Sequence, residues 1–299
     1  MRVLVAGCGY VGWPLAQELA RRGHATFGLR RTPDHLTRSA ATAPPVTLWS
    51  ADLTRPDTLR HLPRDFDWVV NCVASGGGEV TAYQRLYLEG MQHLLQWLAP
   101  GPGPHSCRLL YTSSTGVYGQ NDGSEVTETS VTQPATATAR ILLRAEQTLL
   151  ETAHAKQFPA TVLRVAGIYG PGRGYLLKRF LRGEARIEGN GGRWLNMIHR
   201  ADLIQTILAA LERARPGEIY NVTDDEPVRQ RDFFRWLAHQ LNRPLPPTAA
   251  EQAANRKRGL TSKRVSNHKL KTELGVNLRY PSYREGYRDL LNHDGLDGL

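Results

Sequence analysis

The first dozen residues constrain the fold of this chain more than any other stretch. Val3 to Ala6 is a short apolar run, which is typical of a buried parallel strand and too short for a helix. Glycines follow at Gly-x-Gly-x-x-Gly spacing, and apolar residues then recur at helical period. A strand, a glycine-rich turn and a helix predict a site for the pyrophosphate of a dinucleotide. The residues of this predicted site are Gly7, Cys8, Gly9, Tyr10, Val11 and Gly12.

The end of the second predicted strand indicates which dinucleotide binds. This strand runs from His24 to Leu29 and is followed by Arg30 and Arg31. Sites for NAD usually place Asp or Glu at this point for the ribose hydroxyl, whereas sites for NADP use arginine against the 2′-phosphate. Two guanidinium groups and no carboxylate therefore predict NADP, with NAD as the alternative cofactor. The other interpretation is that both arginines are exposed loop charges.

Strands and helices are predicted to alternate along the first half of the chain. Further strands are predicted at 46–49, 67–73, 107–111 and 160–165, and helices at 83–98 and 141–155. This alternation predicts an α/β fold with a doubly wound parallel Rossmann sheet. From about Gly170 the alternation breaks down. We therefore expect a dinucleotide-binding core over residues 1–170 and a smaller, mixed substrate-binding portion over 171–299, interleaved with the core.

The composition of the chain argues against some classes of binding partner. No apolar run approaches the ~20 residues of a membrane span. The net charge of +10 comes from dispersed arginines without a stacked-aromatic RNA motif, so we expect no nucleic acid. Cys8, Cys72 and Cys107 lack disulfide or metal-ligand spacing, which favours buried thiols in a cytoplasmic protein and no metal site. A small-molecule substrate is the expected partner, and the sequence leaves a homodimer open.

Several motifs in order resemble the extended short-chain dehydrogenase/reductase superfamily, in its NAD-dependent epimerase/dehydratase branch. The motifs are Tyr111-Thr-Ser-Ser-Thr-Gly-Val-Tyr-Gly119, Asp52-Leu53, Ile168-Tyr-Gly-Pro-Gly172, Asn196-Met-Ile-His-Arg-Ala-Asp202 and Tyr220-Asn-Val-Thr-Asp224. The resemblance implies a cofactor-binding set that also includes Asp52, Leu53, Ile168 and the loop residues Ala74 and Ser75. It implies that Ser114 bonds a substrate carbonyl or alkoxide. The alternative for Ser114 is a strand-end serine that satisfies backbone groups.

The chain departs from the family at the catalytic pair. The family's proton donor is a tyrosine, with a lysine four residues later, and these positions fall on Thr138 and Leu142. Threonine is too weak an acid at neutral pH, and leucine carries no charge that could lower the pKa of a neighbour. The chain therefore resembles the atypical members, which keep the cofactor fold and lose part of the catalytic set.

Other side chains are then candidates for the proton donor. We place Tyr87 and Tyr118 with Ser114 as candidate catalytic residues, although packing is the alternative for Tyr118. His199 is interpreted as ordering backbone, and Asp202 as a cap at the start of a helix.

Two classes of function follow. The first is an NADP(H)-dependent oxidoreductase or epimerase/dehydratase-like enzyme that acts on a small polar, sugar-like or carbonyl substrate. The second is a non-catalytic NADP(H)-binding redox sensor or regulatory protein. The enzyme is favoured mainly because the chain keeps the Ser113, Ser114 and Thr115 cluster.

Overall fold

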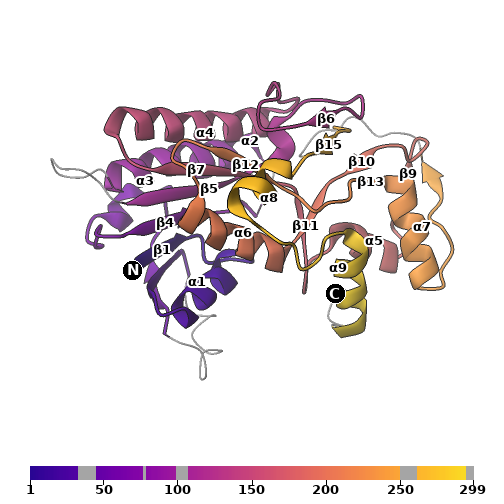
Figure 1. The fold of residues 1–299 in the computed structure, drawn as a ribbon, viewed down its shortest axis with the longest axis horizontal. Coiled ribbons are helices and arrows are strands. Elements are labelled where there is room, and N and C mark those ends of the chain that lie inside the picture. The colour runs from indigo at the N-terminus through magenta and orange to yellow at the C-terminus, as the bar shows by residue number, and fades with distance from the viewer. Residues whose placement is uncertain (33–44, 77–78, 99–106, 250–260, 294–299) are drawn as a thin grey trace. The chain divides into compact units, whose positions relative to one another are not determined.

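Strands and helices alternate along the chain, as the ribbon in Figure 1 shows. The computed structural model describes residues 1–32, 45–76, 79–98, 107–249 and 261–293. The strands of the main sheet are β1 (Arg2–Ala6), β2 (Ala25–Arg30), β3 (Thr47–Ser50), β4 (Trp68–Asn71), β5 (Arg108–Ser114), β7 (Ala160–Val165) and β12 (Ile219–Val222). The helical elements among them are α1 (Gly12–Arg21), η2 (Pro56–Leu59), α2 (Val80–Tyr83), η3 (Gln84–Glu89), α3 (Gly90–Leu98) and α4 (Ala137–Lys156).

The seven strands form one sheet in the order β12-β7-β5-β4-β1-β2-β3. β1 lies near the middle and pairs in parallel with β2 and β4, and Leu4 is opposite Phe27 on one side and Val69 on the other. The chain winds outward in both directions from β1, which confirms the predicted doubly wound α/β fold. β12 is a strand that the sequence pattern does not predict, and β5 continues to Ser114 instead of ending at Tyr111 as predicted.

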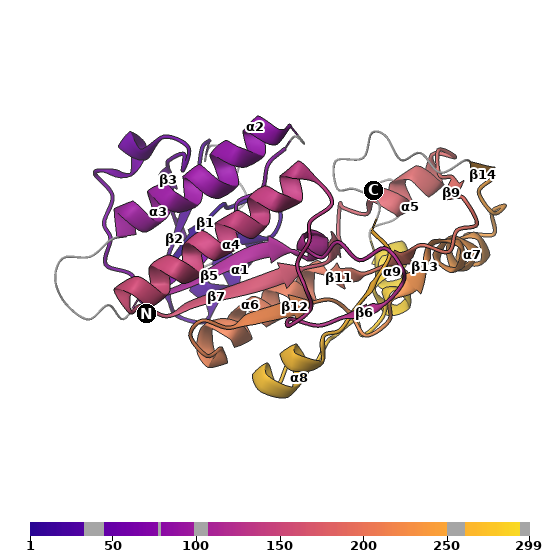
Figure 2. The same ribbon diagram turned by 90° about the horizontal axis from the view of Figure 1, so that it is seen from above.

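Helices cover both faces of the sheet. Figures 1 and 2 show α3 and α4 over one face and α1 on the opposite side. The helix predicted at 83–98 begins earlier, at Val80, and its segment Gln84–Glu89 is π-helical rather than α-helical. None of the helices in the described ranges is long and apolar enough to cross a membrane.

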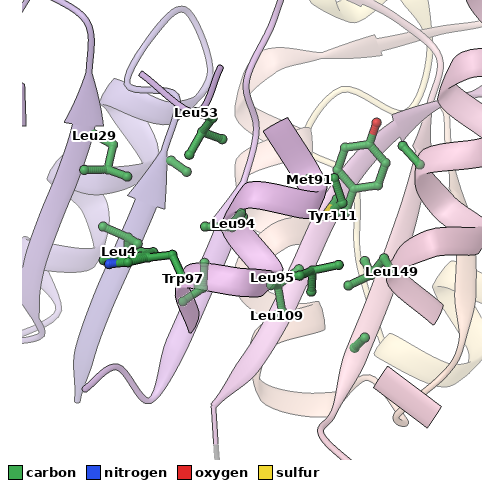
Figure 3. Packing of buried hydrophobic residues seen from close by; sticks show 14 of the residues in the cluster. Leu4, Leu29, Leu53, Met91, Leu94, Leu95, Trp97, Leu109, Tyr111 and Leu149 are labelled. Carbon is green, nitrogen blue, oxygen red and sulfur yellow. The ribbon is translucent and has the colours of Figure 1, made fainter. Parts of the chain in front are cut away.

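A core of large apolar side chains joins α3 and α4 to the sheet. Met91, Leu94 and Leu95 come from α3, Leu149 from α4 and Leu109 from β5, and all are at least nine-tenths buried. Figure 3 shows these side chains packed between the helices and the strands. Burying each such side chain contributes about 1.5–3 kcal/mol, so this core holds the carboxyl ends of the strands in fixed positions.

The rest of the chain is organised around smaller sheets. Its elements are η4 (Thr115–Val117), β6 (Glu125–Val126), β8 (Gly167–Tyr169), α5 (Tyr175–Leu181), β9 (Ile187–Glu188), β10 (Trp194–Leu195), β11 (Met197–His199), α6 (Arg200–Arg213), β13 (Val228–Arg229), α7 (Gln230–Gln240), β14 (Thr248–Ala249), β15 (Arg264–Val265), α8 (His268–Leu274) and α9 (Tyr283–His293). An aromatic core that includes Phe233, Phe234 and Tyr283 fills this region.

The chain divides into two compact units. Unit 1 comprises Met1–Ser114, Ala137–Arg164 and Thr206–Tyr220, and unit 2 comprises Thr115–Thr136, Val165–Gln205 and Asn221–Leu299. This division differs from the expected boundary at residue 170, because each unit takes segments from both sides of that position.

Candidate functional site

The turn between β1 and α1 contains three glycines. Packing requires glycine at the first and last of these positions, whereas the middle position is open. A Cβ on Gly7, whose φ is +97°, would lie 2.7 Å from the backbone of Val73. A Cβ on Gly12 would lie 2.2 Å from the carbonyl oxygen of Gly7. A Cβ on Gly9 would meet no atom of the described residues within 4 Å. The turn therefore packs tightly on the sheet through its first and third glycines, and its exposed middle glycine leaves room for a pyrophosphate to approach the backbone.

The guanidinium of Arg30 lies beside this turn. Arg30 ends β2, and its Nη1 donates to the carbonyl oxygen of Cys8 at 3.4 Å. The side chain is half-buried, whereas Arg31 is exposed and its carbonyl oxygen accepts from the hydroxyl of Ser50. The positive charge of Arg30 favours ionisation of the buried Cys8 thiol, but burial has the larger effect and raises the pKa of this thiol to about 12. Cys8 is therefore an inert thiol, and Arg30 is a cation held against the glycine turn.

The loop after β3 is fixed by its own polar groups. Oδ1 of Asp52 accepts from the backbone N–H of Thr54 at 2.9 Å and from its hydroxyl at 2.8 Å. Leu53 is buried, and its carbonyl oxygen is 2.7 Å from Nδ1 of His93. These contacts give Asp52 and Leu53 a defined position in unit 1 at the carboxyl end of β3.

The loop after β4 contacts a tyrosine on the π-helical segment. The backbone N–H of Ser75 donates to the hydroxyl oxygen of Tyr87 at 3.1 Å. The ring of Tyr87 also lies 4.8 Å from that of Tyr83, centroid to centroid. Because the Tyr87 oxygen accepts here, its own proton is available for another acceptor. Ala74 is exposed, and the glycines at 77 and 78 lie outside the described residues.

The end of β5 presents two serines on opposite sides of the strand. Ser113 is buried, and its hydroxyl donates to Oε1 of Glu146 at 2.5 Å. Glu146 lies on α4 and forms a buried ion pair with Arg164 of β7, at 2.8 Å between Oε2 and Nη2. Ser114 is half-buried on the other side. The Glu146–Arg164 pair therefore holds the strand end at the residue before Ser114.

Tyr111 and Tyr118 are both fully buried. Burial raises the pKa of Tyr111 well above its usual range, and its hydroxyl has no hydrogen-bond partner among the described residues. Figure 3 shows this hydroxyl directed away from the leucine cluster. The hydroxyl of Tyr118 donates to Oδ1 of Asn221 at 2.8 Å. These environments favour a packing role for Tyr118 over the proton-donor role.

Thr138 and Leu142, where the sequence resemblance places the family's catalytic pair, lie on one buried face of α4. Thr138, Leu142 and Glu146 follow one another at four-residue spacing and are all at least nine-tenths buried. Neither Thr138 nor Leu142 carries a group that ionises near neutral pH. This face of α4 therefore offers one carboxylate, already paired with Arg164, and no tyrosine or lysine.

Unit 2 holds the remaining predicted residues. Ile168 lies in β8 and pairs with Ile198 of β11. Nδ1 of His199 accepts the backbone N–H of Ala201, and burial lowers the pKa of this imidazole to about 4, so it is neutral at physiological pH.

Asp202 does not cap its own helix by hydrogen bonding, and that prediction is wrong. Its carboxylate accepts the backbone N–H groups of Arg279 at 2.7 Å and Tyr280 at 3.0 Å. It thereby anchors a segment 77 residues further along the chain, a partner that local sequence could not reveal.

Three buried charged residues carry no signal in the local sequence. The Glu146–Arg164 ion pair joins residues 18 apart, and nothing in the local pattern marks either as buried. Lys263 is 3% exposed and lies in a stretch that reads as a solvated basic segment.

Comparison with known proteins agrees with this geometry. The model of the NAD dependent epimerase/dehydratase family matches residues 3–223. Protein YeeZ of Escherichia coli (strain K12) is 28% identical, over 94% of this chain and 96% of its own. A 3-diazoavenalumate denitrifying reductase of Streptomyces sp is also 28% identical, over 96% of this chain and 99% of its own. The structure of a functionally unknown conserved protein from Silicibacter pomeroyi is 32% identical, covers 98% of this chain and 99% of its own, and superposes with a TM-score of 0.75.

Proposed function

Because the chain belongs to the NAD dependent epimerase/dehydratase family, we propose that it is an NADP(H)-dependent oxidoreductase for a small polar, sugar-like or carbonyl substrate. The observation that carries this proposal is the placement of Arg30 beside the open glycine turn. A dinucleotide laid on that turn extends its adenine ribose toward the end of β2. The ribose 2′-phosphate of NADP is the anion that a cation at this position would bind.

The reductive direction has support from a relative. The Streptomyces protein, which matches this chain over nearly its full length, is named a reductase. Bound NADPH would supply a hydride to an electrophilic atom of the substrate. The side chains of unit 1 would then have to stabilise negative charge on the substrate and deliver a proton.

Ser114 and Tyr87 are the residues to which we assign these two tasks. The hydroxyl of Ser114 would donate a hydrogen bond to the developing oxyanion, because it lies at the carboxyl end of β5, where ligands of such sheets bind. Tyr87 keeps a transferable proton while its oxygen accepts from Ser75. Thr138 has no comparable acidity, so it takes no part in the proposed proton transfer.

Substitution of Arg30 tests the cofactor assignment. Arg30→Ala should weaken NADPH binding by about 2 kcal/mol, roughly 30-fold, because it removes a charged partner of a phosphate. NADH binding should hardly change. Isothermal titration calorimetry measures both affinities, and Arg31→Ala serves as a matched exposed control. Equal affinity of the unsubstituted protein for NADPH and NADH would contradict the assignment.

The second candidate is a redox sensor that binds NADP(H) without turnover. The residues Thr138 and Leu142 favour it, because neither can act as the tyrosine or the lysine that the family uses for proton transfer. Incubation with NADPH and a panel of aldehydes, ketones and nucleotide sugars separates the candidates. Oxidation of NADPH that depends on a substrate supports the enzyme. Tight NADPH binding with no oxidation across the panel supports the sensor.

A further inference from the structure

Lys263 lies on a segment of unit 2 whose backbone is held on both sides. On one side, the carbonyl oxygen of Ser262 accepts the N–H of Gly123, and the N–H of Arg264 donates to the carbonyl oxygen of Ser124. From the other side, the amide of Asn196 donates to the carbonyl oxygen of Lys263 at 2.9 Å. It also accepts the N–H of Val265 at 2.8 Å. The position from which the Lys263 side chain extends is therefore rigid.

The ammonium of Lys263 is buried among neutral groups. Nζ donates to the carbonyl oxygen of Tyr118 and to the hydroxyl of Thr261, each at 2.9 Å. Within the described ranges no carboxylate lies at ion-pair distance from it, and burial lowers its pKa to about 8. An ammonium carries three N–H donors, so two are used and one has no acceptor among these residues.

A buried cation without a counter-charge is costly, and another deeply buried cation of the described residues does have a counter-charge. Arg164 in unit 1 is paired with Glu146, whose carboxylate is 1% exposed. Among the described residues Lys263 has only uncharged partners, which recover a small part of the hydration lost by the ammonium. An arrangement of this kind, costly in the free protein, is characteristic of groups reserved for a ligand.

A second buried donor lies at the other end of Tyr118. Asn221 is fully buried, and its Oδ1 accepts the Tyr118 hydroxyl. Nδ2 of Asn221 has no hydrogen-bond partner among the described residues. Tyr118 is thus flanked by two groups with unused donor capacity among the described residues: the third N–H of Lys263 Nζ near its carbonyl, and Nδ2 of Asn221 near its hydroxyl. Oxygen-rich anions are the ligands that satisfy such donors.

We propose that Lys263 binds a carboxylate or phosphate group of the substrate, with Asn221 as a second donor in the same part of unit 2. Calling the ligand the substrate rests on the proposed function; the anion site itself does not. The ligand would supply the negative charge that no described residue provides to this lysine. The substrate would then be an acidic small molecule.

Anion binding by Lys263→Met tests the proposal, with Lys271→Met as the matched control. Lys271 is an exposed lysine that pairs with Asp225. Inorganic phosphate and acetate are titrated separately, with and without saturating NADPH, and the melting temperature is followed. We expect one of the two anions to stabilise the unsubstituted protein and Lys271→Met alike. Lys263→Met should bind that anion about tenfold more weakly or not at all. The anion that acts identifies the group as a phosphate or a carboxylate.

Lysine labelling with acetic anhydride gives a second readout that does not depend on the stability of a variant. Mass spectrometry should show Lys263 acetylated as the pH rises through about 8 and protected by the effective anion. The proposal is overturned if Lys263 stays unlabelled throughout, or if Lys263→Met responds to both anions as the unsubstituted protein does. A purely structural brace would give those results. Failure to bind NADPH would overturn the proposed function but leave the anion responses measured without NADPH as they are.

Discussion

At the scale of single residues, the three glycines of the turn after β1 lack a side chain for different reasons. Gly7 and Gly12 are surrounded by backbone, at distances of 2.7 and 2.2 Å from an added Cβ. Gly9 is exposed, and no atom of the described protein would touch its Cβ. The spacing of these glycines alone predicts a turn that binds a pyrophosphate, because the strand and helix on either side leave few geometries for a turn. It could not show that Val73 is the neighbour of Gly7.

Substitution at Gly9 and Gly7 should separate binding from folding. Gly9→Val should abolish dinucleotide binding and leave the melting temperature within a degree or two, because its side chain enters space kept for the pyrophosphate. Gly7→Ala should destabilise the protein by about 2 kcal/mol or more, since it overpacks against Val73 at a positive φ. Calorimetric titration and thermal melting measure the two effects. A folded Gly9→Val protein that still binds NADPH would place the nucleotide elsewhere.

At the scale of elements, the strand β5 divides structure and function between its two faces. Ser113 faces α4 and is bound to Glu146, and Ser114 lies on the opposite side. Local pattern located β5 from its apolar residues but ended it at Tyr111, because the polar run Thr112 to Thr115 reads as a loop. The Glu146 carboxylate on α4 accepts a hydrogen bond from Ser113 and so stabilises this polar end of β5 within the sheet.

Alanine substitutions of the two serines should therefore have different effects, one on turnover and the other on stability. Ser114→Ala should lower turnover by ~10²-fold with little change in stability, the usual scale for deleting a donor to an oxyanion. Ser113→Ala should lower the free energy of unfolding by about 1–3 kcal/mol, because it leaves one oxygen of a buried carboxylate less satisfied. Thr138→Val is the control and should leave turnover unchanged. Undiminished turnover in Ser114→Ala would show that this serine is structural.

Elements that depend on local sequence could be predicted, and features that depend on contacts between distant residues could not. β7 was predicted at residues 160–165, which are its observed bounds, because all six of its residues are buried and apolarity marks most of them. The π-helical segment at Gln84–Glu89 was missed, because a wider turn leaves no distinct signature in apolar spacing. β12 was missed because four residues in an irregular region carry too little pattern. Lys263 was missed because its partner Tyr118 is 145 residues away.

At the scale of the whole molecule, a buried acid couples stability to pH. Asp224 is 1% exposed, and neither of its oxygens makes a well-formed hydrogen bond among the described residues. Burial raises its pKa well above the usual range, and the nearby carboxylates of Asp225 and Asp202 add to this. An acid whose pKa is raised by folding stabilises the folded state most when it is protonated. That contribution is complete below about pH 4 and is lost as the pH rises toward the folded-state pKa.

Asp224→Asn should therefore raise the free energy of unfolding at pH 7, because the amide cannot ionise. The difference from the unsubstituted protein should shrink by at most about 1.4 kcal/mol per pH unit as the pH falls toward 4. Urea denaturation at several pH values measures it. Asp225→Asn is the control: it removes an exposed pair with Lys271 and should cost about 1 kcal/mol or less. A difference that does not vary with pH would show that Asp224 is charged in the folded protein.

The division of the chain into interleaved units has a consequence for how it folds during synthesis on the ribosome. β12 completes the sheet beside β7, yet it is made more than fifty residues later. At a synthesis rate of roughly 5–20 residues per second, β7 waits on the order of 3–10 s for its neighbour. During that interval the nascent sheet ends in an apolar strand with open N–H and C=O groups, the surface that invites pairing with another chain. In the complete protein β12 covers this edge of β7. The edge is open to pairing with another chain in the seconds before β12, which ends at Val222, has been made.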